Sequence, residues 1–447
     1  MKIRYIFCFF YFMKEIIWDF CYNSLYKEKI IKITKNSLYE GNNMQLNLIN
    51  RPQYLNQLLQ FQNTEFIKVL TGVRRSGKSY ILMLYREYLL KHNINEHQII
   101  YISFEDFDNI DLYDPKQLYS YLKERIISDQ RMYILLDEIQ YVSDWQKVVN
   151  SLRLNPLLDI TITGSNSNLL SGELATLLSG RYVEIYVYPL SFKEMLDFKH
   201  ISEPSERQID NLYDEYIKYG GFPAVVLAKE ELKQTILSGI YNTIIVNDIG
   251  YKNGLREPEL VALVAKYLAD SIGQLINPNK IVNTLKSANF DISYNAVQRY
   301  LKYFEEAYLF YKSSRYDIRG RKILSTQGKY YIVDTGLRTQ ALGERNNDRG
   351  SVLENIVYVE LLRRGYTVQI GKLDNKEIDF IASKVNDKQY IQVTYQLPEN
   401  STRETDNLLQ IPNNYKKIVI SGRYENKEMI SGIPIINIKD WLLASND

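Results

Sequence analysis

The segment GVRRSGKS at residues 72–79 constrains the fold of this chain more than any other feature. It follows the apolar run FIKVLT and leads directly into the helical pattern YILMLYREYLLK. The two glycines let the backbone curl, so that its N–H groups and the amino end of the helix surround phosphate groups. The segment therefore predicts a strand, a phosphate-binding loop and a helix, the central unit of an α/β protein.

The spacing G-x-x-x-x-G-K-S also assigns roles to single residues of the loop. We expect Lys78 to reach the β- and γ-phosphates of ATP, and the Ser79 hydroxyl to ligate Mg²⁺. ATP and Mg²⁺ are therefore the expected cofactors. The residues predicted to surround the nucleotide are Gly72, Val73, Arg74, Arg75, Ser76, Gly77, Lys78, Ser79 and Tyr80.

A second motif is the apolar run YILLDE at 133–138, which ends in two adjacent acids. Neighbouring residues of a strand point to opposite sides, so Asp137 and Glu138 can serve different partners. We expect Asp137 to hold the metal ion, directly or through water, and Glu138 to polarise the water that attacks the γ-phosphate. A kinase must exclude water here, so the pair favours an ATPase. An exposed acidic strand end is the alternative.

Short apolar runs alternate with helical patterns from residue 66, which is typical of a parallel sheet covered by helices. The extra run between the loop and the acidic strand favours the additional-strand class of P-loop ATPases, in which strand 160–163 lies between the loop strand and the acidic strand. Ligands bind at the carboxyl ends of such strands. The expected strands are 66–71, 99–104, 133–138, 160–163 and 182–187.

Two further catalytic residues are predicted beyond these strands. Strand 160–163 ends in TGSN, where Ser165 or Asn166 can hydrogen-bond the γ-phosphate or the attacking water. A polar turn that caps the next helix is the alternative. Arg181 is the candidate for a charge-stabilising arginine, supplied in cis or by a neighbouring subunit, and a structural ion pair is its alternative.

Composition argues against several other classes of protein. The only cysteines, Cys8 and Cys21, leave the rest of the chain without a disulfide framework, which favours a reducing, cytoplasmic compartment. The 3 histidines lack metal-ligand spacing, and a net charge of +2 predicts no nucleic-acid or membrane partner for the molecule as a whole. The apolar run at 6–13 is far shorter than the roughly 20 residues that span a bilayer.

Several motifs together resemble a known family. They are TGVRRSGKS, SFED, LLDEIQ, TGSNSNLLSGELATLLSGRY, PLSF and YGGFP. The pattern is similar to prokaryotic AAA-type ATPases that carry a C-terminal domain of unknown function 4143, and the match runs from about Met44 to the end. The resemblance implies an AAA ATPase domain, a winged-helix segment and a restriction-endonuclease-like C-terminal domain. It implies no substrate.

The pattern along the chain predicts five segments. They are an N-terminal extension or mis-assigned start at 1–43, a P-loop AAA domain at 44–205, a helical lid at 206–258, a winged-helix domain at 259–342 and an α/β restriction-endonuclease-like domain at 343–447. In the fourth, a helix-turn-helix pattern precedes a hairpin. The candidate DNA contacts are Asn295, Gln298, Arg299 and Lys302 on the second helix, and Arg319 and Arg321 in the hairpin. A protein-binding module is the alternative.

In the last segment, Glu354 and Asp379 match the acids of a restriction-endonuclease-like core. The remaining E-x-K pair would be Gln392-Val-Thr394, which lacks a carboxylate and a lysine. Two oxygen ligands are weak support for a divalent ion. We therefore expect this domain to bind nucleic acid or protein without cutting.

These observations predict an enzyme that hydrolyses Mg-ATP and couples turnover to rearrangement of a DNA- or protein-binding C-terminal half. One alternative is an ATP-regulated nuclease or defence-type effector. Another is a nucleotide-bound DNA-binding regulator with little turnover. The sequence leaves open a homo-oligomer, in which Arg181 would act in trans.

Overall fold

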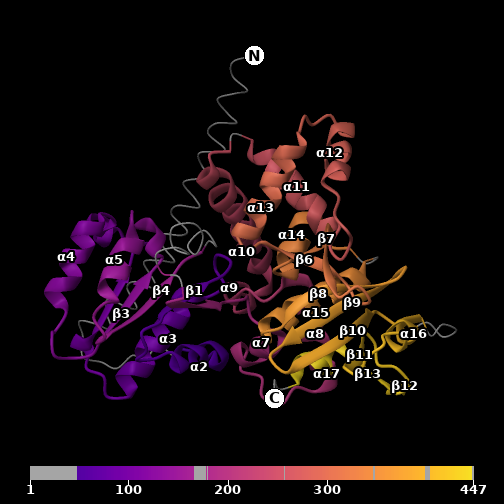
Figure 1. Cartoon of the computed structure of the whole chain (residues 1–447), viewed down its shortest axis with the longest axis horizontal. Coiled ribbons are helices and arrows are strands. Elements are labelled where there is room, and N and C mark those ends of the chain that lie inside the picture. The colour runs from indigo at the N-terminus through magenta and orange to yellow at the C-terminus, as the bar shows by residue number, and fades with distance from the viewer. Residues whose placement is uncertain are drawn as a thin grey trace. The chain divides into compact units, whose positions relative to one another are not determined.

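A computed structural model of the chain describes residues 48–165, 178, 180–255, 257–345, 348–397 and 403–444. The predicted extension at 1–43 lies outside these residues. Asn50–Asp447 form one compact unit, which contains two β-sheets (Figure 1). Within the part of the chain that the structure describes, no helix combines the length and apolar character that crossing a membrane requires.

The first sheet has five strands, and all of its pairs are parallel. The strands are β1 (Ile67–Thr71), β2 (Ile99–Ser103), β3 (Met132–Asp137), β4 (Leu158–Thr163) and β5 (Tyr182–Tyr186). Their order is β2-β3-β4-β1-β5, so β4 lies between β1 and β3 as predicted. All five predicted strands are confirmed. Because the strands are parallel, their carboxyl ends meet at one edge of the sheet.

Helices cover both faces of this sheet, which explains its apolar strands (Figure 1). On one face α2 (Pro52–Gln60) and α3 (Lys78–Lys91) contribute Leu58 and Tyr85 to the core. On the other face α4 (Pro115–Arg125) and α5 (Trp145–Leu152) contribute buried leucine, valine and tryptophan side chains. Short 3₁₀ turns are η1 (Glu96–Gln98), η2 (Phe107–Tyr113) and η3 (Ile139–Tyr141).

A helical region follows the first sheet. Its first two helices are α7 (Phe192–Phe198) and α8 (Glu206–Tyr219), and α8 begins at the first residue of the predicted helical lid. Ser205 and Gln208 form a capping box there, a signal that is readable in the sequence. The following elements are α9 (Pro223–Val226), α10 (Glu230–Asn242), the π-helix η5 (Thr243–Gly250), η6 (Tyr251–Asn253), α11 (Pro258–Asp270), α12 (Pro278–Ser287) and α13 (Tyr294–Glu306).

The second sheet has eight strands in the order β12-β13-β11-β10-β9-β8-β6-β7. They are β6 (Phe310–Asp317), β7 (Lys322–Ile332), β8 (Thr367–Leu373), β9 (Lys376–Lys384), β10 (Asp387–Thr394), β11 (Lys416–Ser421), β12 (Met429–Ile430) and β13 (Ile433–Asn437). The hairpin β6–β7 is present as predicted. It also pairs in parallel with β8, at Arg315 and Ile370, so strand pairing crosses the predicted boundary after residue 342.

The helices of this last region are α14 (Thr335–Leu342), α15 (Arg349–Arg363), α16 (Arg403–Leu409) and α17 (Ile438–Leu443). On one face of the second sheet, Phe380 lies 5.8 Å from the ring of Tyr358 in α15. On the other face, Ile381 packs in a cluster with Leu408 of α16. Because adjacent residues of β9 thus face different helices, both faces of the sheet are buried.

Candidate functional site

The loop between β1 and α3 has the glycine geometry that a phosphate-binding turn requires. Gly72 has φ 134°, and Gly77, which precedes the first residue of α3, has φ 100°. A Cβ added at Gly72 would lie 2.3 Å from the carbonyl oxygen of Val187. No side chain fits there, so the close approach of the loop to the segment after β5 depends on glycine.

Lys78 is the first residue of α3, and its side chain is buried at 3% exposure. Its Nζ donates to the carbonyl oxygens of Gly72 at 3.0 Å and Val73 at 3.2 Å, and lies 4.0 Å from a carboxylate oxygen of Glu138. Burial lowers the pKa of Lys78 because the charged form is poorly solvated. The ammonium group thus lies across the loop, held mainly by neutral carbonyl groups.

Asp137, at the end of β3, meets two hydroxyl groups. The Ser79 Oγ donates to its Oδ1 at 3.0 Å, and the Thr163 Oγ1 donates to the same oxygen at 2.6 Å. Burial raises the pKa of Asp137 to about 6. Mg²⁺ prefers carboxylate and hydroxyl oxygens, so Ser79 and Asp137 fit this ion. Thr163 was not predicted as a site residue, although its position at the end of β4 was.

Glu138 lies just beyond β3, not on it as predicted. Its φ of 55° is left-handed, and its backbone N–H donates to the Thr163 Oγ1 at 2.8 Å. The side chain is only 8% exposed and accepts a hydrogen bond from the Gln140 side chain. A left-handed non-glycine residue is uncommon and costs about 1 kcal/mol or more, so the surrounding structure must hold it. This turn, and not strand alternation, separates Glu138 from Asp137.

The two remaining predicted catalytic residues have different outcomes. Asn166 lies outside the described residues, while its neighbour Ser165 is buried. Arg181 precedes β5, and its carbonyl accepts a hydrogen bond from the N–H of Ile67, the first residue of β1. It therefore lies at the amino end of the sheet, about 16 Å from the loop at about 3.3 Å per strand residue. The structure does not bring Arg181 to the loop, and its role in trans stays a prediction.

Arg74 connects the loop to the helical region. Its Nε lies 3.0 Å from the Asp248 Oδ2 in η5, and its Nη1 lies 3.5 Å from the Glu105 Oε1 after β2. Although burial alone would lower it, contact with Asp248 holds the pKa of Arg74 above its usual value. Asp248 is far from the loop in sequence, and no local pattern predicts this contact. The motif SFED does contain Glu105.

The other residues of the loop differ in their exposure to solvent. Arg75 is exposed and has φ 68°, whereas Val73 and Ser76 are buried. Tyr80 lies one turn into α3, with its ring 6.4 Å from that of Phe198. The loop is thus anchored by its apolar and small residues, while Arg75 faces solvent.

The candidate DNA contacts are all exposed. The four on α13 are Asn295, Gln298, Arg299 and Lys302, and the two in the hairpin turn are Arg319 and Arg321. The apolar face of α13 is buried as predicted: it consists of Val297, Tyr300, Leu301 and Phe304. Two of the cations have acidic neighbours, Glu306 at 3.3 Å from Lys302 and Asp374 at 2.9 Å from Arg319. DNA binding and the winged-helix fold stay predictions.

The acids predicted in the last segment lie near a lysine that the sequence patterns did not indicate. The Lys329 Nζ, on β7, lies 3.0 Å from a carboxylate oxygen of Glu354 and 2.7 Å from one of Glu377. The Tyr331 hydroxyl donates to Glu354 at 2.6 Å. Lys329 was missed because it lies on the strand expected to form a wing, and only the sheet brings it to α15.

Asp379 is buried on β9 and accepts a hydrogen bond from the backbone N–H of Val393 at 2.8 Å. Burial, and then the charge of Glu354, raise the pKa of Asp379 well above its usual value. Gln392 is buried, and its Oε1 has no hydrogen-bond partner among the described residues. No group of three or more histidine, cysteine or acidic residues in the described part of the chain is arranged to hold a metal ion.

Comparisons with known proteins agree with this organisation. An AAA domain model matches residues 64–196, and a domain of unknown function (DUF8612) matches residues 210–348. The chain is 53% identical to an uncharacterised protein of Haemophilus influenzae, over 89% of this chain and 99% of that protein. It is 35% identical to the uncharacterised protein MJ1544 of Methanocaldococcus jannaschii, over 76% of this chain and 77% of that protein.

Likeness to solved structures is weak. The Walker-type ATPase PABY2304 of Pyrococcus abyssi gives a TM-score of 0.44 at 15% identity, covering 66% of this chain and 97% of that one. Cdc6p of Pyrobaculum aerophilum gives 0.31 at 12% identity, covering 72% of this chain and 98% of that one. Scores this low carry no argument about function.

The parallel sheet, the phosphate loop and the AAA-domain match together define an ATP-binding, AAA-like P-loop NTPase fold. The chain belongs to the same family as the Haemophilus influenzae protein and MJ1544, and it carries an AAA domain followed by a domain of unknown function. Neither model reaches residues 349–447. The resemblance of that segment to domain of unknown function 4143 and to a restriction-endonuclease-like fold therefore stays a prediction.

Proposed function

We propose that this protein hydrolyses Mg-ATP at the carboxyl edge of its first sheet, by attack of water on the γ-phosphate. The observation that carries the proposal is the meeting of four groups at that edge. Ser79 lies 3.0 Å from Asp137, and Lys78 lies 4.0 Å from Glu138. These groups come from the last residue of β3, the residue after it and the start of α3, and only the parallel sheet brings them together.

Mg²⁺, when bound with ATP, supplies positive charge that neutralises the phosphates. Ser79 and Asp137 are the residues that would hold it, because their oxygens are already in contact. Lys78 would exchange the carbonyl oxygens of Gly72 and Val73 for phosphate oxygens. That exchange is favourable because a buried ammonium group gains more from an anion than from a neutral carbonyl.

Glu138 is the proposed general base. Its carboxylate accepts a hydrogen bond from Gln140 and lies 4.0 Å from the Lys78 Nζ, so it would lie beside the phosphates that Lys78 would contact. A carboxylate in this position orients water and accepts its proton. The proposed contributions of Asn166, and of Arg181 from a neighbouring copy in a homo-oligomer, add charge stabilisation at the same phosphate.

We propose further that turnover rearranges a C-terminal half that binds DNA or protein. The exposed polar face of α13 supports the binding part, because Asn295, Gln298 and Arg299 point away from the buried face. The surroundings of Glu354 on α15 support binding of DNA without cutting, because Lys329 and Tyr331 already contact its carboxylate. A reducing, cytoplasmic location is part of this proposal.

Separate measurements of nucleotide binding and phosphate release test the enzymatic part. Glu138→Gln is expected to retain ATP affinity and to lower the rate of phosphate release by about 100- to 10,000-fold, the usual contribution of a general base. Lys78→Ala is expected to lose both. A parent protein that neither binds ATP nor releases phosphate would refute the proposal. Turnover by Glu138→Gln at the parent rate would leave the static regulator as the better account.

A panel of single-stranded DNA, double-stranded DNA and RNA tests the binding part. If α13 contacts phosphates, Arg299→Gln should weaken binding and lower the salt dependence of the affinity by about one ion. Arg125→Gln is a matched control, since Arg125 is an exposed arginine of α4, outside α13 and outside the phosphate loop. Equal affinity of all three proteins for every nucleic acid would favour a protein partner.

A further inference from the structure

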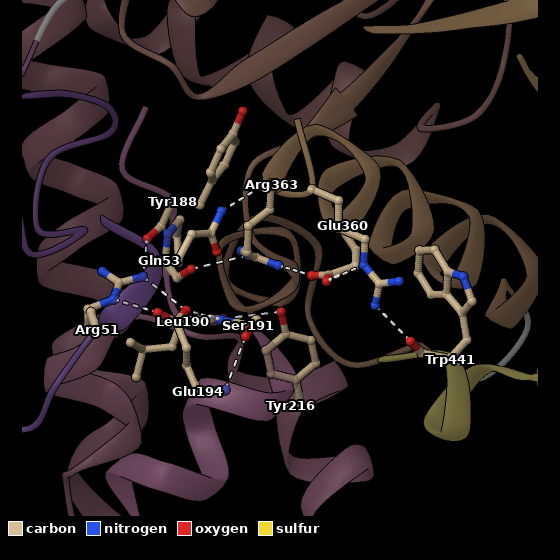
Figure 2. A network of polar contacts seen from close by, with 12 residues as sticks. Arg51, Gln53, Tyr188, Leu190, Ser191, Glu194, Tyr216, Glu360, Arg363 and Trp441 are labelled. Atoms are coloured by element: carbon tan, nitrogen blue, oxygen red, sulfur yellow. Dashed lines mark hydrogen bonds and ion pairs between the residues drawn. The ribbon is translucent and has the colours of Figure 1, made fainter. Parts of the chain in front are cut away.

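Arg51, just before α2, is a buried arginine that contacts the phosphate loop. It is 1% exposed, and its Nη1 donates to the carbonyl oxygen of Ser76 at 3.0 Å. Ser76 precedes Gly77 and Lys78, so Arg51 holds the backbone directly before the phosphate-binding lysine. Figure 2 shows the guanidinium group of Arg51 among its partners.

Three other hydrogen bonds fix the plane of the Arg51 guanidinium. Its Nε and Nη2 form a bidentate pair with Glu194 of α7, at 2.7 and 3.0 Å, and Nη2 also donates to the carbonyl oxygen of Tyr188 at 3.0 Å. Although burial alone would raise it, Arg51 holds the pKa of Glu194 below its usual value. A paired, planar guanidinium is rigid, so a shift of the Ser76 carbonyl must displace Tyr188 or break a bond.

A second arginine holds the next carbonyl of the same segment. The Arg363 Nη2, at the end of α15, donates to the carbonyl oxygen of Pro189 at 3.1 Å (Figure 2). The Arg363 guanidinium also lies 5.6 Å from the centre of the Tyr188 ring. Gln53 of α2 donates to the backbone carbonyl of Arg363 at 2.7 Å. Arg51 and Arg363, which are far apart in the sequence, thus donate to the consecutive carbonyl groups of Tyr188 and Pro189.

The remaining bonds of Arg363 lead into the C-terminal half. Arg363 pairs with Glu360, and Glu360 also accepts from the Arg364 Nε at 2.8 Å. The Arg364 Nη2 donates to the carbonyl oxygen of Trp441 in α17 at 2.7 Å. These contacts join the segment after β5 to α15, which packs on the second sheet.

We propose that the Tyr188–Ser191 segment, held by Arg51 and Arg363, couples nucleotide binding at the loop to the C-terminal half. We name this segment and the two arginines the arginine junction. Both arginines are positioning residues, since neither lies in the loop itself. The proposal rests on the proposed function, because it requires that the loop binds nucleotide.

The physical basis is that the loop must change its contacts when nucleotide binds. Lys78 now bonds the carbonyl oxygens of Gly72 and Val73, and it must leave them to reach phosphates. The backbone next to Lys78 is bonded to Arg51, so the change reaches Tyr188 and Pro189. Thermodynamic linkage then requires the reverse effect: a change at Arg363 alters the affinity for nucleotide, typically by about 5- to 150-fold.

Equilibrium binding of a non-hydrolysable ATP analogue to the full chain tests this inference. Arg363→Met keeps an apolar stem but removes the donors to Pro189, and we expect its affinity for the analogue to fall at least about fivefold. Arg349→Met is the matched control. It removes an arginine from the other end of α15, where Nη1 donates to the Tyr395 hydroxyl at 2.6 Å, so its affinity should equal that of the parent.

Hydrogen exchange of α15 supplies a readout that mere destabilisation would not move. In the parent, the analogue should change the exchange rates of α15 amides, and in Arg363→Met this response should be lost while Arg363→Lys partly restores it. If Arg363→Met does not fold, Gln53→Leu removes the bond from α2 to Arg363 and should weaken binding in the same direction, by a smaller factor.

Two results would be decisive in different ways. If Arg363→Met and Gln53→Leu bind the analogue like the parent, and α15 shows no response to it, the junction does not couple the two regions. If the parent binds no analogue at all, the proposed function itself fails, and the junction has nothing to transmit.

Discussion

Each of the two sheets places a buried lysine beside carboxylates. In the first sheet the charge of the lysine remains available to a ligand, whereas in the second it is already neutralised by ion pairs. In the first sheet, Lys78 donates to carbonyl groups and lies 4.0 Å from Glu138. In the second, Lys329 forms direct ion pairs with Glu354 and Glu377 at 3.0 and 2.7 Å. The same residue types therefore have different capacities for an added charge.

The directions of the lysine pKa shifts express this difference. Burial lowers the pKa of Lys78, and the nearby charges of Glu138 and Asp137 offset the lost hydration only partly. Burial alone would also lower the pKa of Lys329, but Glu354 and the other carboxylates hold it above its usual value. Lys78 thus has a charge that an anion would stabilise, whereas the charge of Lys329 is already paired.

The sharpest test of this contrast is stability without nucleotide. Lys329→Met should lower the free energy of unfolding by about 3 kcal/mol, the lower end for breaking a buried ion pair, because the lysine is buried but its partners Glu354 and Glu377 are only partly buried. Lys78→Met should cost much less, since it breaks no close ion pair. Chemical denaturation measures both values. Equal losses in the two variants would show that the lysines are equally satisfied, and the comparison would fail.

The acids of the two sheets should differ in the other direction, because ATP turnover should depend on the acid of the first sheet and not on that of the second. Asp137→Asn is expected to lower the rate of phosphate release by about 100- to 1,000-fold, comparable to the loss of one group that stabilises transition-state charge. Asp379→Asn should leave the rate unchanged, because Asp379 accepts its hydrogen bond from Val393 within the second sheet. Steady-state phosphate release gives both numbers. A strong effect of Asp379→Asn would link the two sheets functionally.

Bound nucleotide should stabilise the folded protein, and this gain should depend on Lys78 and not on Lys329. At a concentration of Mg-ATP one hundred times its Kd, the expected gain is about 2.7 kcal/mol for the parent. A correctly folded Lys329→Met should show the same gain, and Lys78→Met should show almost none. Thermal melts with and without Mg-ATP, and with EDTA as the metal-removal control, measure it. A full gain in Lys78→Met would place the nucleotide elsewhere.

The smallest expected effect is an absence of DNA cleavage. Because Lys329 and Tyr331 contact Glu354, added Mg²⁺ or Mn²⁺ should find no free carboxylate pair. Incubation of DNA with the parent and either metal should leave it intact. Metal-dependent cutting that disappears in Asp379→Ala would establish the nuclease alternative.

Much of the first sheet could be predicted from local sequence. The strand runs are continuously apolar because both faces are buried, and glycines occupy two of the three positive-φ positions of the loop, Gly72 and Gly77, while Arg75 occupies the third. Helix α8 begins and ends as expected, since a capping box and a glycine with φ 72°, Gly220, mark its ends. The order of β1, β3 and β4 also followed from the chain order.

The positions of Arg181 and Lys329 in the structure depend on contacts between distant parts of the chain. Arg181 was predicted as a charge-stabilising arginine, but it precedes β5, and a parallel strand starts at the edge opposite to the loop. The hairpin that contains Lys329 was predicted within the winged-helix domain, but the pairing of β6 with β8 brings this hairpin into the second sheet. Strand order and register, which short patterns do not encode, decide both positions.

By itself, the sequence determined the phosphate loop, its strand and helix, and the acidic strand end, because each depends on residues within a few positions of one another. Only the tertiary structure decided which charges are neutralised and which remain available. Lys78 and Lys329 look alike as single residues. They differ because an ammonium group is stabilised by the carboxylates that the fold brings within about 3 Å, and the path of the whole chain sets those neighbours.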